Sequence, residues 1–238
     1  MPLEWKQTTI GKTKITHWKR HNPAKLLEAL ARPPIAEVGE HPRVRRYAFE
    51  KLHLAVREFE YGDGRYNTAK DSFTILRKLA RQRAAFVEAP VAFIDRKGQL
   101  PAIVTIWKKR TRKLSEFLKD ESVSEILKER ACITAARKIA MLHGNGFIHG
   151  HLRVDNFLVD KRTGNSHLVD YTLLREAPGL GEMEMAQAVD GIAAKCYLAD
   201  IDKHWKLRSA LVERMQKAYR EQREKMQRKR ESAKKEIR

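Results

Sequence analysis

The sequence predicts an α+β protein in which a mostly strand-forming part precedes a mostly helical part. Residues 44–59, 87–93 and 102–107 are rich in β-branched and aromatic side chains with partial alternation, which is typical of strands. Residues 122–142 and 203–219 instead repeat apolar side chains at helical spacing, which is typical of amphipathic helices. We therefore expect a small sheet followed by a helical part.

The composition favours a compact folded chain. With 238 residues, of which 42% are hydrophobic, the chain is long enough to bury a substantial core in one domain or two small lobes. Because Cys132 and Cys196 are the only cysteines, neither a disulfide framework nor a cysteine-rich zinc module organises the fold. No stretch has the length and apolarity of a membrane span, and the amino terminus does not resemble a signal peptide. A cytoplasmic protein is expected.

The charge predicts a polyanionic partner. The chain has 49 Lys and Arg residues against 30 Asp and Glu, a formal net charge of +19. This excess is larger than solubility requires. Candidate partners are RNA, phospholipid headgroups and a phosphorylated glycolipid, and the alternative is a solvated basic surface. A phospholipid partner would place the protein at the inner face of the membrane.

The first half of the chain contains the following expected elements. Residues 1–34 form a basic, weakly patterned lead with one helix at Pro23–Ala31, which two consecutive prolines end. Strands are expected at Val44–Phe49 and at 52–59, joined by a tight connection. A helix is expected at 68–82, where apolar residues recur at helical spacing.

Two more strands, at residues 87–93 and 102–107 with a turn at 96–98, complete the expected sheet. The dense basic run at 108–113 follows directly. This run either steers and holds an anionic substrate or is a solvated loop.

A long helix is expected to begin with a capping box in which Ser122 caps and Glu125 reaches back. Its apolar stripe consists of Leu127, Ala131, Ala135, Ile139 and Leu142. In the helical tail, the first half is expected to pack on the larger lobe. Residues 220–238 are expected to form a solvated basic extension that can lie along RNA or an anionic membrane.

A predicted β-hairpin is the most informative part of the chain. A residue of a type that binds metal ions stands at the open end of each of its two strands. Residues 157–159 and 167–169 are apolar strands, joined by turn-forming residues 163–166. Antiparallel pairing places Asn156 beside Asp170. An amide oxygen and a carboxylate suit Mg²⁺, which takes oxygen ligands and keeps part of its shell for water and phosphate. The hairpin therefore predicts a Mg-nucleotide site.

The segment His-Gly-His-Leu-Arg-Val-Asp-Asn at residues 149–156, followed by Asp170, resembles the catalytic loop and metal-binding hairpin of the protein-kinase-like fold. The His-Gly-x-Leu form is more similar to small atypical members of that superfamily. These are the lipopolysaccharide core Kdo and heptose kinases, the RIO kinases and the small kinase of the tRNA threonylcarbamoyl-adenosine complex. The resemblance implies a two-lobed kinase-like fold with ATP and Mg as cofactors.

Matching positions give the implied roles of the motif residues. His149 matches the structural histidine, Asn156 the second metal ligand and Asp170 the principal metal ligand. His151 stands where the catalytic aspartate is expected, which is the main departure from the family pattern. Histidine is a general base near neutral pH, so His151 remains a catalytic candidate. Arg153 replaces the catalytic-loop lysine and keeps a cation for the transferred phosphate.

The resemblance also assigns nucleotide-binding residues in the first lobe. Arg57 stands where the phosphate-pairing lysine of the third strand is expected, and an arginine fork can hold phosphate oxygens. Thr105 and Trp107 fall in the hinge that reads adenine through backbone hydrogen bonds. Ser72 occupies the position of the helix glutamate that pairs with the lysine, and the neighbouring Asp71 either pairs with Arg57 or makes only a surface contact.

The segment after Asp170 is too short for the long activation segment of ordinary protein kinases, which favours the small-molecule branch. Asp190 resembles the buried helix aspartate that braces the catalytic loop. The implied organisation is a basic N-terminal extension (1–34), a kinase-like N-lobe (35–107), a kinase-like C-lobe (108–219) and a basic helical tail (220–238).

Two functions follow as alternatives. The first is Mg-ATP-dependent phosphoryl transfer to a non-peptide or glycolipid acceptor, most like the lipopolysaccharide core kinases. The second is a catalytically impaired pseudokinase that binds RNA, a ribonucleoprotein or a protein partner, because His151, Arg57 and Ser72 all depart from the family pattern.

A transition-metal site built from histidines is a further alternative. Its candidate ligands are His143, His149, His151, His167 and Asp170. Against it, His149 and His151 flank a single residue and point in opposite directions in an extended chain, and His143 belongs to the preceding helix.

Overall fold

A computed structural model describes residues 4–38, 44–50, 52–59, 69–81, 90–150, 152–170, 173–176, 201, 205 and 209–236. The fold is α+β, as expected. The chain divides into two compact units, Met1–Lys109 and Arg110–Arg238. Two of the predicted site residues, His151 and Asp190, lie outside the described residues.

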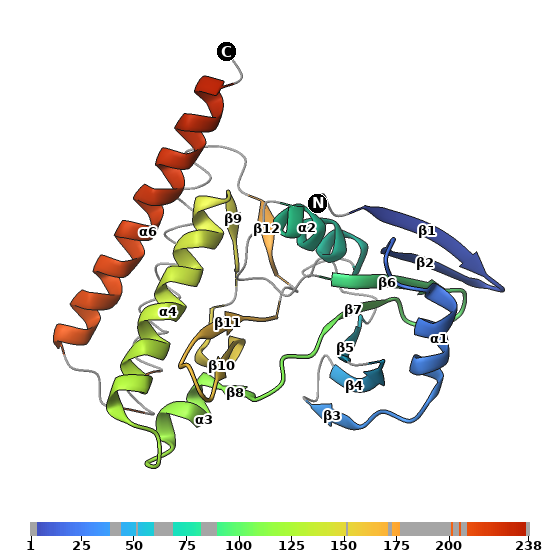
Figure 1. Cartoon of the computed structure of the whole chain (residues 1–238), viewed down its shortest axis with the longest axis horizontal. Helices are drawn as coiled ribbons and strands as arrows, with labels where there is room; N and C mark the ends of the chain where they lie inside the picture. The colour runs from blue at the N-terminus through green and yellow to red at the C-terminus, as the bar shows by residue number, and fades with distance from the viewer. Residues whose placement is uncertain are drawn as a thin grey trace. The chain divides into compact units, whose positions relative to one another are not determined.

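The first unit is built on an antiparallel seven-stranded sheet (Figure 1). In spatial order its strands are β1 (Trp5–Ile10), β2 (Thr13–Trp18), β6 (Pro90–Arg96), β7 (Ala102–Ile106), β5 (Leu52–Glu58), β4 (Val44–Phe49) and β3 (Ala36–Val38). The predicted β4 is confirmed at its expected bounds, and β5 and β7 each end one residue earlier than expected. Strand β6 runs from Pro90 to Arg96, and the expected strand residues 87–89 lie outside the described residues.

The amino-terminal residues correct the expectation of a weakly patterned lead with a single helix. Strands β1 and β2 form a hairpin whose register runs from Trp5 opposite Trp18 to Ile10 opposite Thr13. Strand β2 also pairs with β6, so the hairpin extends the sheet. The strand pattern was missed because Thr and Lys carry much of the alternation, and these residues read as a basic loop.

Helix α1 (Pro23–Ala31) is confirmed at its expected bounds. The Asn22 side chain caps it, because Asn22 Oδ1 accepts hydrogen bonds from the amides of Ala24 at 2.9 Å and Lys25 at 3.3 Å. Proline in the first turn is already restricted to the helical φ.

The two faces of the sheet carry different layers. Pairing of Val56 with Val104 and of Tyr47 with Leu54 places these four residues on one face. The core on this face joins the sheet to α1 and includes Ile15, Leu26, Ala29, Tyr47, Phe49, Leu54, Val56, Ala92, Ile94 and Val104.

Helix α2 (Ala69–Arg81) packs on the opposite face, against β6 and β7. Its Phe73 ring stacks on Phe93 at 5.3 Å and meets Trp5 edge-on at 5.2 Å. Phe93 pairs with Ile103 and alternates with the core residues Ala92 and Ile94, so its side chain points away from the α1 face. The helix lies within the expected range of 68–82.

The second unit packs helices against short strands. Its described elements are β8 (Thr111–Lys113), α3 (Leu114–Lys119), α4 (Glu125–Gly144), β9 (Phe147–Ile148), the 3-10 helix η1 (Val154–Asn156), β10 (Phe157–Asp160), β11 (Ser166–Leu168), β12 (Arg175–Glu176) and α6 (Ser209–Glu236). Strand β10 lies between β8 and β11, and β9 pairs with β12.

Helices α4 and α6 lie side by side (Figure 1). The buried side chains of the described first half of α6 are Leu211, Met215 and Ala218. Arg214 Nη1 lies 2.6 Å from Glu129 Oε2, and His143 Nδ1 is hydrogen-bonded to the Tyr219 hydroxyl at 2.7 Å. The expected stripe on α4 is present, because Ala131, Ala135, Ile139 and Leu142 are buried.

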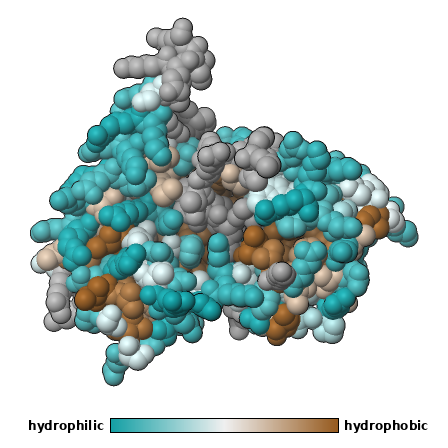
Figure 2. Space-filling view, in the orientation of Figure 1, coloured by the Kyte–Doolittle hydropathy of each residue, from teal (hydrophilic) through white to brown (hydrophobic). Residues whose placement is uncertain are grey.

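The rest of α6 is mostly polar and exposed, but the half-buried Met226 packs against Gly144 of α4, so the expected solvated extension is partly packed. Figure 2 shows hydrophilic residues over most of its visible surface. Exposed pairs one turn apart join Lys217 to Glu221 at 3.9 Å and Arg228 to Glu224 at 3.3 Å. Such pairs stabilise a helix by only about 0.3–0.5 kcal/mol each. No helix in the described residues combines the length and apolarity of a membrane span.

The start of α4 corrects the expected capping box. Ser122 donates its amide at 2.8 Å and its hydroxyl at 2.6 Å to Asp120 Oδ1. The helix begins at Glu125 with Ser124 as the N-cap, and the Ser124 side chain makes no capping hydrogen bond. Because Ser122 is hydrogen-bonded to Asp120, it does not cap the helix, and the N-cap lies two residues later, at Ser124.

Replacing Gly144 with alanine is expected to lower the free energy of unfolding by about 1–3 kcal/mol. The added Cβ would lie 2.9 Å from Met226 Cβ and Cγ, so α4 and α6 would have to shift. Helix propensity alone predicts the opposite sign, a gain of about 1 kcal/mol. Urea unfolding followed by circular dichroism measures the sign, and a gain in stability would contradict the close approach of the two helices.

Candidate functional site

The predicted hairpin is present in the second unit and is antiparallel. Its register pairs Phe157 with Leu168, Leu158 with His167 and Val159 with Ser166. Beyond the strands, the Val169 amide donates a hydrogen bond to the Asn156 carbonyl at 2.8 Å. Asn156 therefore lies opposite Val169, and Asp170 is the next residue along the chain. The two predicted metal ligands are brought to the same open end of the hairpin.

The turn at the other end of the hairpin is built around Asp160. Asp160 Oδ1 accepts hydrogen bonds from the amides of Arg162 at 2.9 Å and Thr163 at 2.8 Å, and from the Thr163 hydroxyl at 3.0 Å. Burial disfavours the ionised carboxylate, but these hydrogen bonds outweigh burial and lower the Asp160 pKa. Gly164 then adopts a φ of +67°, where glycine is unstrained.

The segment that leads into Asp170 is held from a second side by His149. The His149 ring is fully buried, and its Nε2 is hydrogen-bonded to the Val169 carbonyl at 3.1 Å. Val169 is thus bonded through its amide to Asn156 and through its carbonyl to His149. This double attachment fixes the backbone on which Asp170 is placed.

Asp170 itself has a left-handed backbone conformation, with a φ of +67°. This region is uncommon for residues other than glycine, although aspartate tolerates it better than most. Residues held in such conformations are concentrated at binding and catalytic sites. The half-buried Asp170 is therefore marked as a functional candidate by its backbone as well as by its position.

The chain on either side of the hairpin also converges. Strand β9 pairs with β12, with Ile148 opposite Arg175 and Phe147 opposite Glu176. A Cβ on Gly150 would lie 2.8 Å from the Leu173 carbonyl oxygen, so only glycine fits there. The residues before and after the predicted catalytic and metal-binding motifs are thereby packed together.

Two further polar side chains accompany Asn156. Arg153 precedes η1, is exposed, and forms no ion pair within the described part of the chain. Asp155 accepts a hydrogen bond from the Ser115 hydroxyl, and Lys113 Nζ lies 3.8 Å from its other carboxylate oxygen. Sequence reasoning missed Asp155, because no spacing signal distinguishes it from an ordinary solvated carboxylate.

The basic run at 108–113 is partly engaged in the fold. Its last three residues form β8, which pairs with β10. The Arg112 guanidinium lies 2.6 Å from Asp120 Oδ2 and 5.1 Å from the centre of the Phe117 ring. Arg112 is therefore committed to the second unit's own structure, which leaves fewer cations for an anionic substrate than the sequence indicates.

The predicted nucleotide-binding residues Arg57, Thr105 and Trp107 belong to the first unit. Pairing of Ala55 with Thr105 and of Arg57 with Ile103 places Arg57 and Thr105 on the sheet face that α2 packs against. The Trp107 amide donates to the His53 carbonyl at 2.8 Å, so this predicted hinge donor is engaged within the protein. The roles assigned to these three residues remain predictions.

Ser72 and Asp71 differ in exposure. Ser72 is fully buried in α2, and its hydroxyl has no hydrogen-bond partner among the described residues. Asp71 is exposed in the first turn. The proposed pairing of Asp71 with Arg57 remains a prediction.

The alternative of a transition-metal site built from histidines gains no support from the described residues. In that part of the chain, no three or more His, Cys, Asp or Glu side chains are grouped to hold a metal. His143 is instead bonded to Tyr219 and His149 to the Val169 carbonyl.

No protein-family model matches the chain, and a search of curated protein sequences finds no match either. The candidate site is therefore defined by the geometry at the open end of the hairpin. Its described residues are His149, Arg153, Asp155, Asn156 and Asp170.

Replacing Asp120 with asparagine is expected to destabilise the protein in a pH-dependent way. Hydrogen bonds from Ser122 and Arg112 lower the Asp120 pKa to about 2 from an ordinary value of 3.8. The carboxylate therefore contributes stability that is fully present above pH 3.8 and is lost as the pH falls through about 2. Urea unfolding between these pH values measures the difference from the wild type, and a difference that grows on acidification would contradict this assignment.

Proposed function

We propose that the protein is a Mg-ATP-dependent phosphotransferase with a two-lobed, kinase-like fold. The proposal is supported by the open end of the β10–β11 hairpin, where Asn156 lies opposite Val169 and Asp170 follows directly. Asp170 supplies a carboxylate oxygen and Asn156 an amide oxygen, which are ligands that Mg²⁺ prefers. A metal held by two protein ligands keeps coordination sites for nucleotide phosphates and water.

Arg153 supports a role in phosphoryl transfer. Catalysis of this reaction depends mainly on positioning and on stabilising the charge of the transferred group. An exposed guanidinium without an ion-pair partner in the described residues is suited to binding phosphate oxygens bidentately. In the proposed mechanism Arg153 binds the transferred phosphoryl group, and His151 accepts the proton of the attacking hydroxyl as a general base.

The acceptor is proposed to be a non-peptide molecule, with a glycolipid of the lipopolysaccharide-core type as the leading class. The motif resemblance and the short segment after Asp170 support this choice over a protein substrate. The net charge of +19 also favours an anionic acceptor, because opposite charge raises its local concentration near the protein.

The second candidate function is a pseudokinase that binds nucleotide or a partner without phosphoryl transfer. Two features favour it: the catalytic aspartate is replaced by His151, and the amide of Trp107 is bonded to His53 rather than being open to adenine. Measurement of γ-phosphate loss distinguishes the two functions, because only the phosphotransferase shows loss that depends on an added acceptor.

The nucleotide site is tested by the melting temperature of the full chain with ATP and Mg²⁺. At a ligand concentration about 100 times Kd, binding to the folded state adds about 2.7 kcal/mol. For a chain of this size, this corresponds to a rise in Tm of about 5–10 °C. The rise is expected to require Mg²⁺ and to be lost in Asp170→Ala.

A matched control is Glu121→Gln, which removes an exposed carboxylate of the same unit that makes no ion pair among the described residues. This variant is expected to retain the full Mg-dependent rise in Tm. The absence of any rise in the wild type at saturating ATP would overturn the proposal, as would an equal loss in Asp170→Ala and Glu121→Gln.

A further inference from the structure

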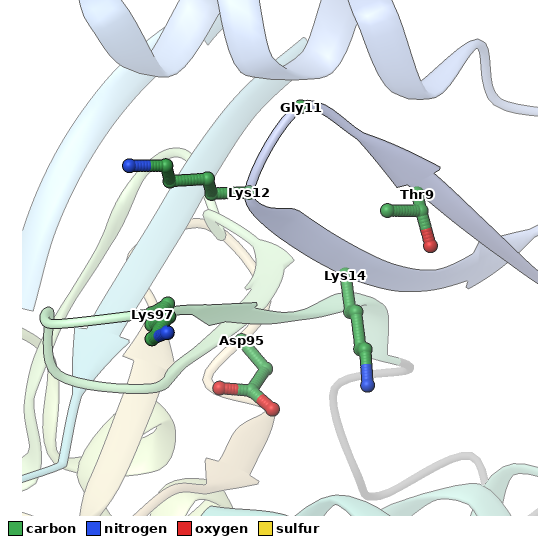
Figure 3. Close-up of a pocket in the computed structure, with 6 residues that line it drawn as sticks. All are labelled: Thr9, Gly11, Lys12, Lys14, Asp95 and Lys97. Atoms are coloured by element: carbon green, nitrogen blue, oxygen red, sulfur yellow. The ribbon is translucent and has the colours of Figure 1, made fainter.

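A hollow of about 410 Å³ lies in the first unit at the tip of the β1–β2 hairpin (Figure 3). Its lining residues are Thr9, Gly11, Lys12, Lys14, Asp95 and Lys97. Three of these six residues are lysines and one is an aspartate, so the hollow is positively charged. Neither the predicted hairpin motif nor the nucleotide-binding residues belong to it.

The sheet register creates this cluster from segments far apart in the sequence. Thr9 pairs with Lys14, and Lys14 pairs with Asp95, so three neighbouring strands present these residues in one row. Lys12 and Lys97 come from the two tight turns next to this row, as Figure 3 shows. The glycines of these turns, Gly11 and Gly98, have φ values of +58° and +80°.

The lysines of the hollow are not neutralised by the protein. Lys12, Lys14 and Lys97 are exposed, and none of them forms an ion pair or a side-chain hydrogen bond within the described residues. By contrast, Lys19 in the loop after the same hairpin is paired with Glu4 at 2.8 Å. Three lysines without such partners around one hollow leave a local positive charge, which attracts a polyanion.

We propose that this hollow binds the phosphate backbone of single-stranded RNA. Lysine ammonium groups on flexible stems act as point charges and can follow successive phosphates without a fixed geometry. Because Lys12 and Lys97 come from two separate turns and Lys14 from strand β2, the lysines are suited to more than one phosphate of the same strand.

Asp95 favours RNA over other polyanions. A carboxylate repels phosphate but accepts a hydrogen bond from a ribose 2′-hydroxyl, the group by which proteins distinguish RNA from DNA. Among the described residues, the lining contains no large apolar side chain that would insert into a membrane interface. This inference does not rest on phosphoryl transfer or on nucleotide binding at the β10–β11 hairpin.

The test uses the full chain and fluorescence anisotropy of a labelled oligouridine of about 12 nucleotides, a length that fits known single-strand sites. The triple variant Lys12→Gln/Lys14→Gln/Lys97→Gln is compared with the wild type. The triple variant is expected to bind the oligonucleotide at least about tenfold more weakly. The negative slope of log affinity against log salt is expected to become shallower by about 2, because three phosphate contacts are removed.

A matched control is the triple variant Lys6→Gln/Lys25→Gln/Lys70→Gln. These lysines are exposed, belong to the same unit and form no ion pair among the described residues, so the control loses the same charge. Its affinity is expected to stay within about threefold of the wild type, since only long-range, screened attraction is lost. Equal melting temperatures show that all variants are folded.

A further variant, Asp95→Ala, tests the choice of RNA. It is expected to reduce the preference for oligouridine over oligodeoxyuridine of the same length. The inference is overturned if the wild type does not bind the oligonucleotide at low salt, if both triple variants lose affinity equally, or if only vesicles containing phosphatidylserine are bound.

Discussion

The hydrogen bond between the Val169 amide and the Asn156 carbonyl is the contact on which the candidate site depends. It continues the β10–β11 register by one step and thereby sets which residues meet at the open end of the hairpin. A slip of one residue in this register would place a different residue opposite Asn156 and change which side chains meet at the open end. His149 secures the same backbone from the other side through the Val169 carbonyl, and the turn around Asp160 holds the closed end.

The charged residues fall into two groups. Some are paired with other groups of the fold, and others are available to bind partners. Described carboxylates such as Asp120 and Glu129 are engaged with arginines of the second unit, and Asp160 is bonded to its own turn. Arg153 and the lysines of the hollow at the tip of the β1–β2 hairpin have no such partners in the described residues. The excess of 49 basic over 30 acidic residues therefore leaves uncompensated cations at particular places in each unit.

Local signals explain which elements were predictable. Helix α1 was placed correctly because Asn22, a proline in the first turn and two following prolines define both ends. The hairpin of the second unit was located because apolar strands flank a strong turn, but β10 extends to Asp160 and β11 runs from Ser166 to Leu168, so its strand bounds differ from those expected. The β1–β2 hairpin was missed because Thr and Lys carry much of its alternation, and its place in the sheet is set by pairing with β6, a contact distant in sequence. The start of α4 was misplaced because Asp120 captures Ser122, and nothing in the capping-box spacing reveals this competition. Asp155 was missed for a similar reason, since its partner Ser115 lies on another element.

Paramagnetic broadening by Mn²⁺ in the amide NMR spectrum tests the proposed divalent-cation site at the open end of the hairpin. Mn²⁺ takes the same oxygen ligands as Mg²⁺. Substoichiometric Mn²⁺, with ATP present, is expected to broaden the amide signals of Asn156, Val169 and Asp170 first, and excess Mg²⁺ is expected to restore them. Broadening spread evenly over residues with exposed carboxylates such as Glu121, with these three signals unaffected, would rule out a cation site at this end of the hairpin.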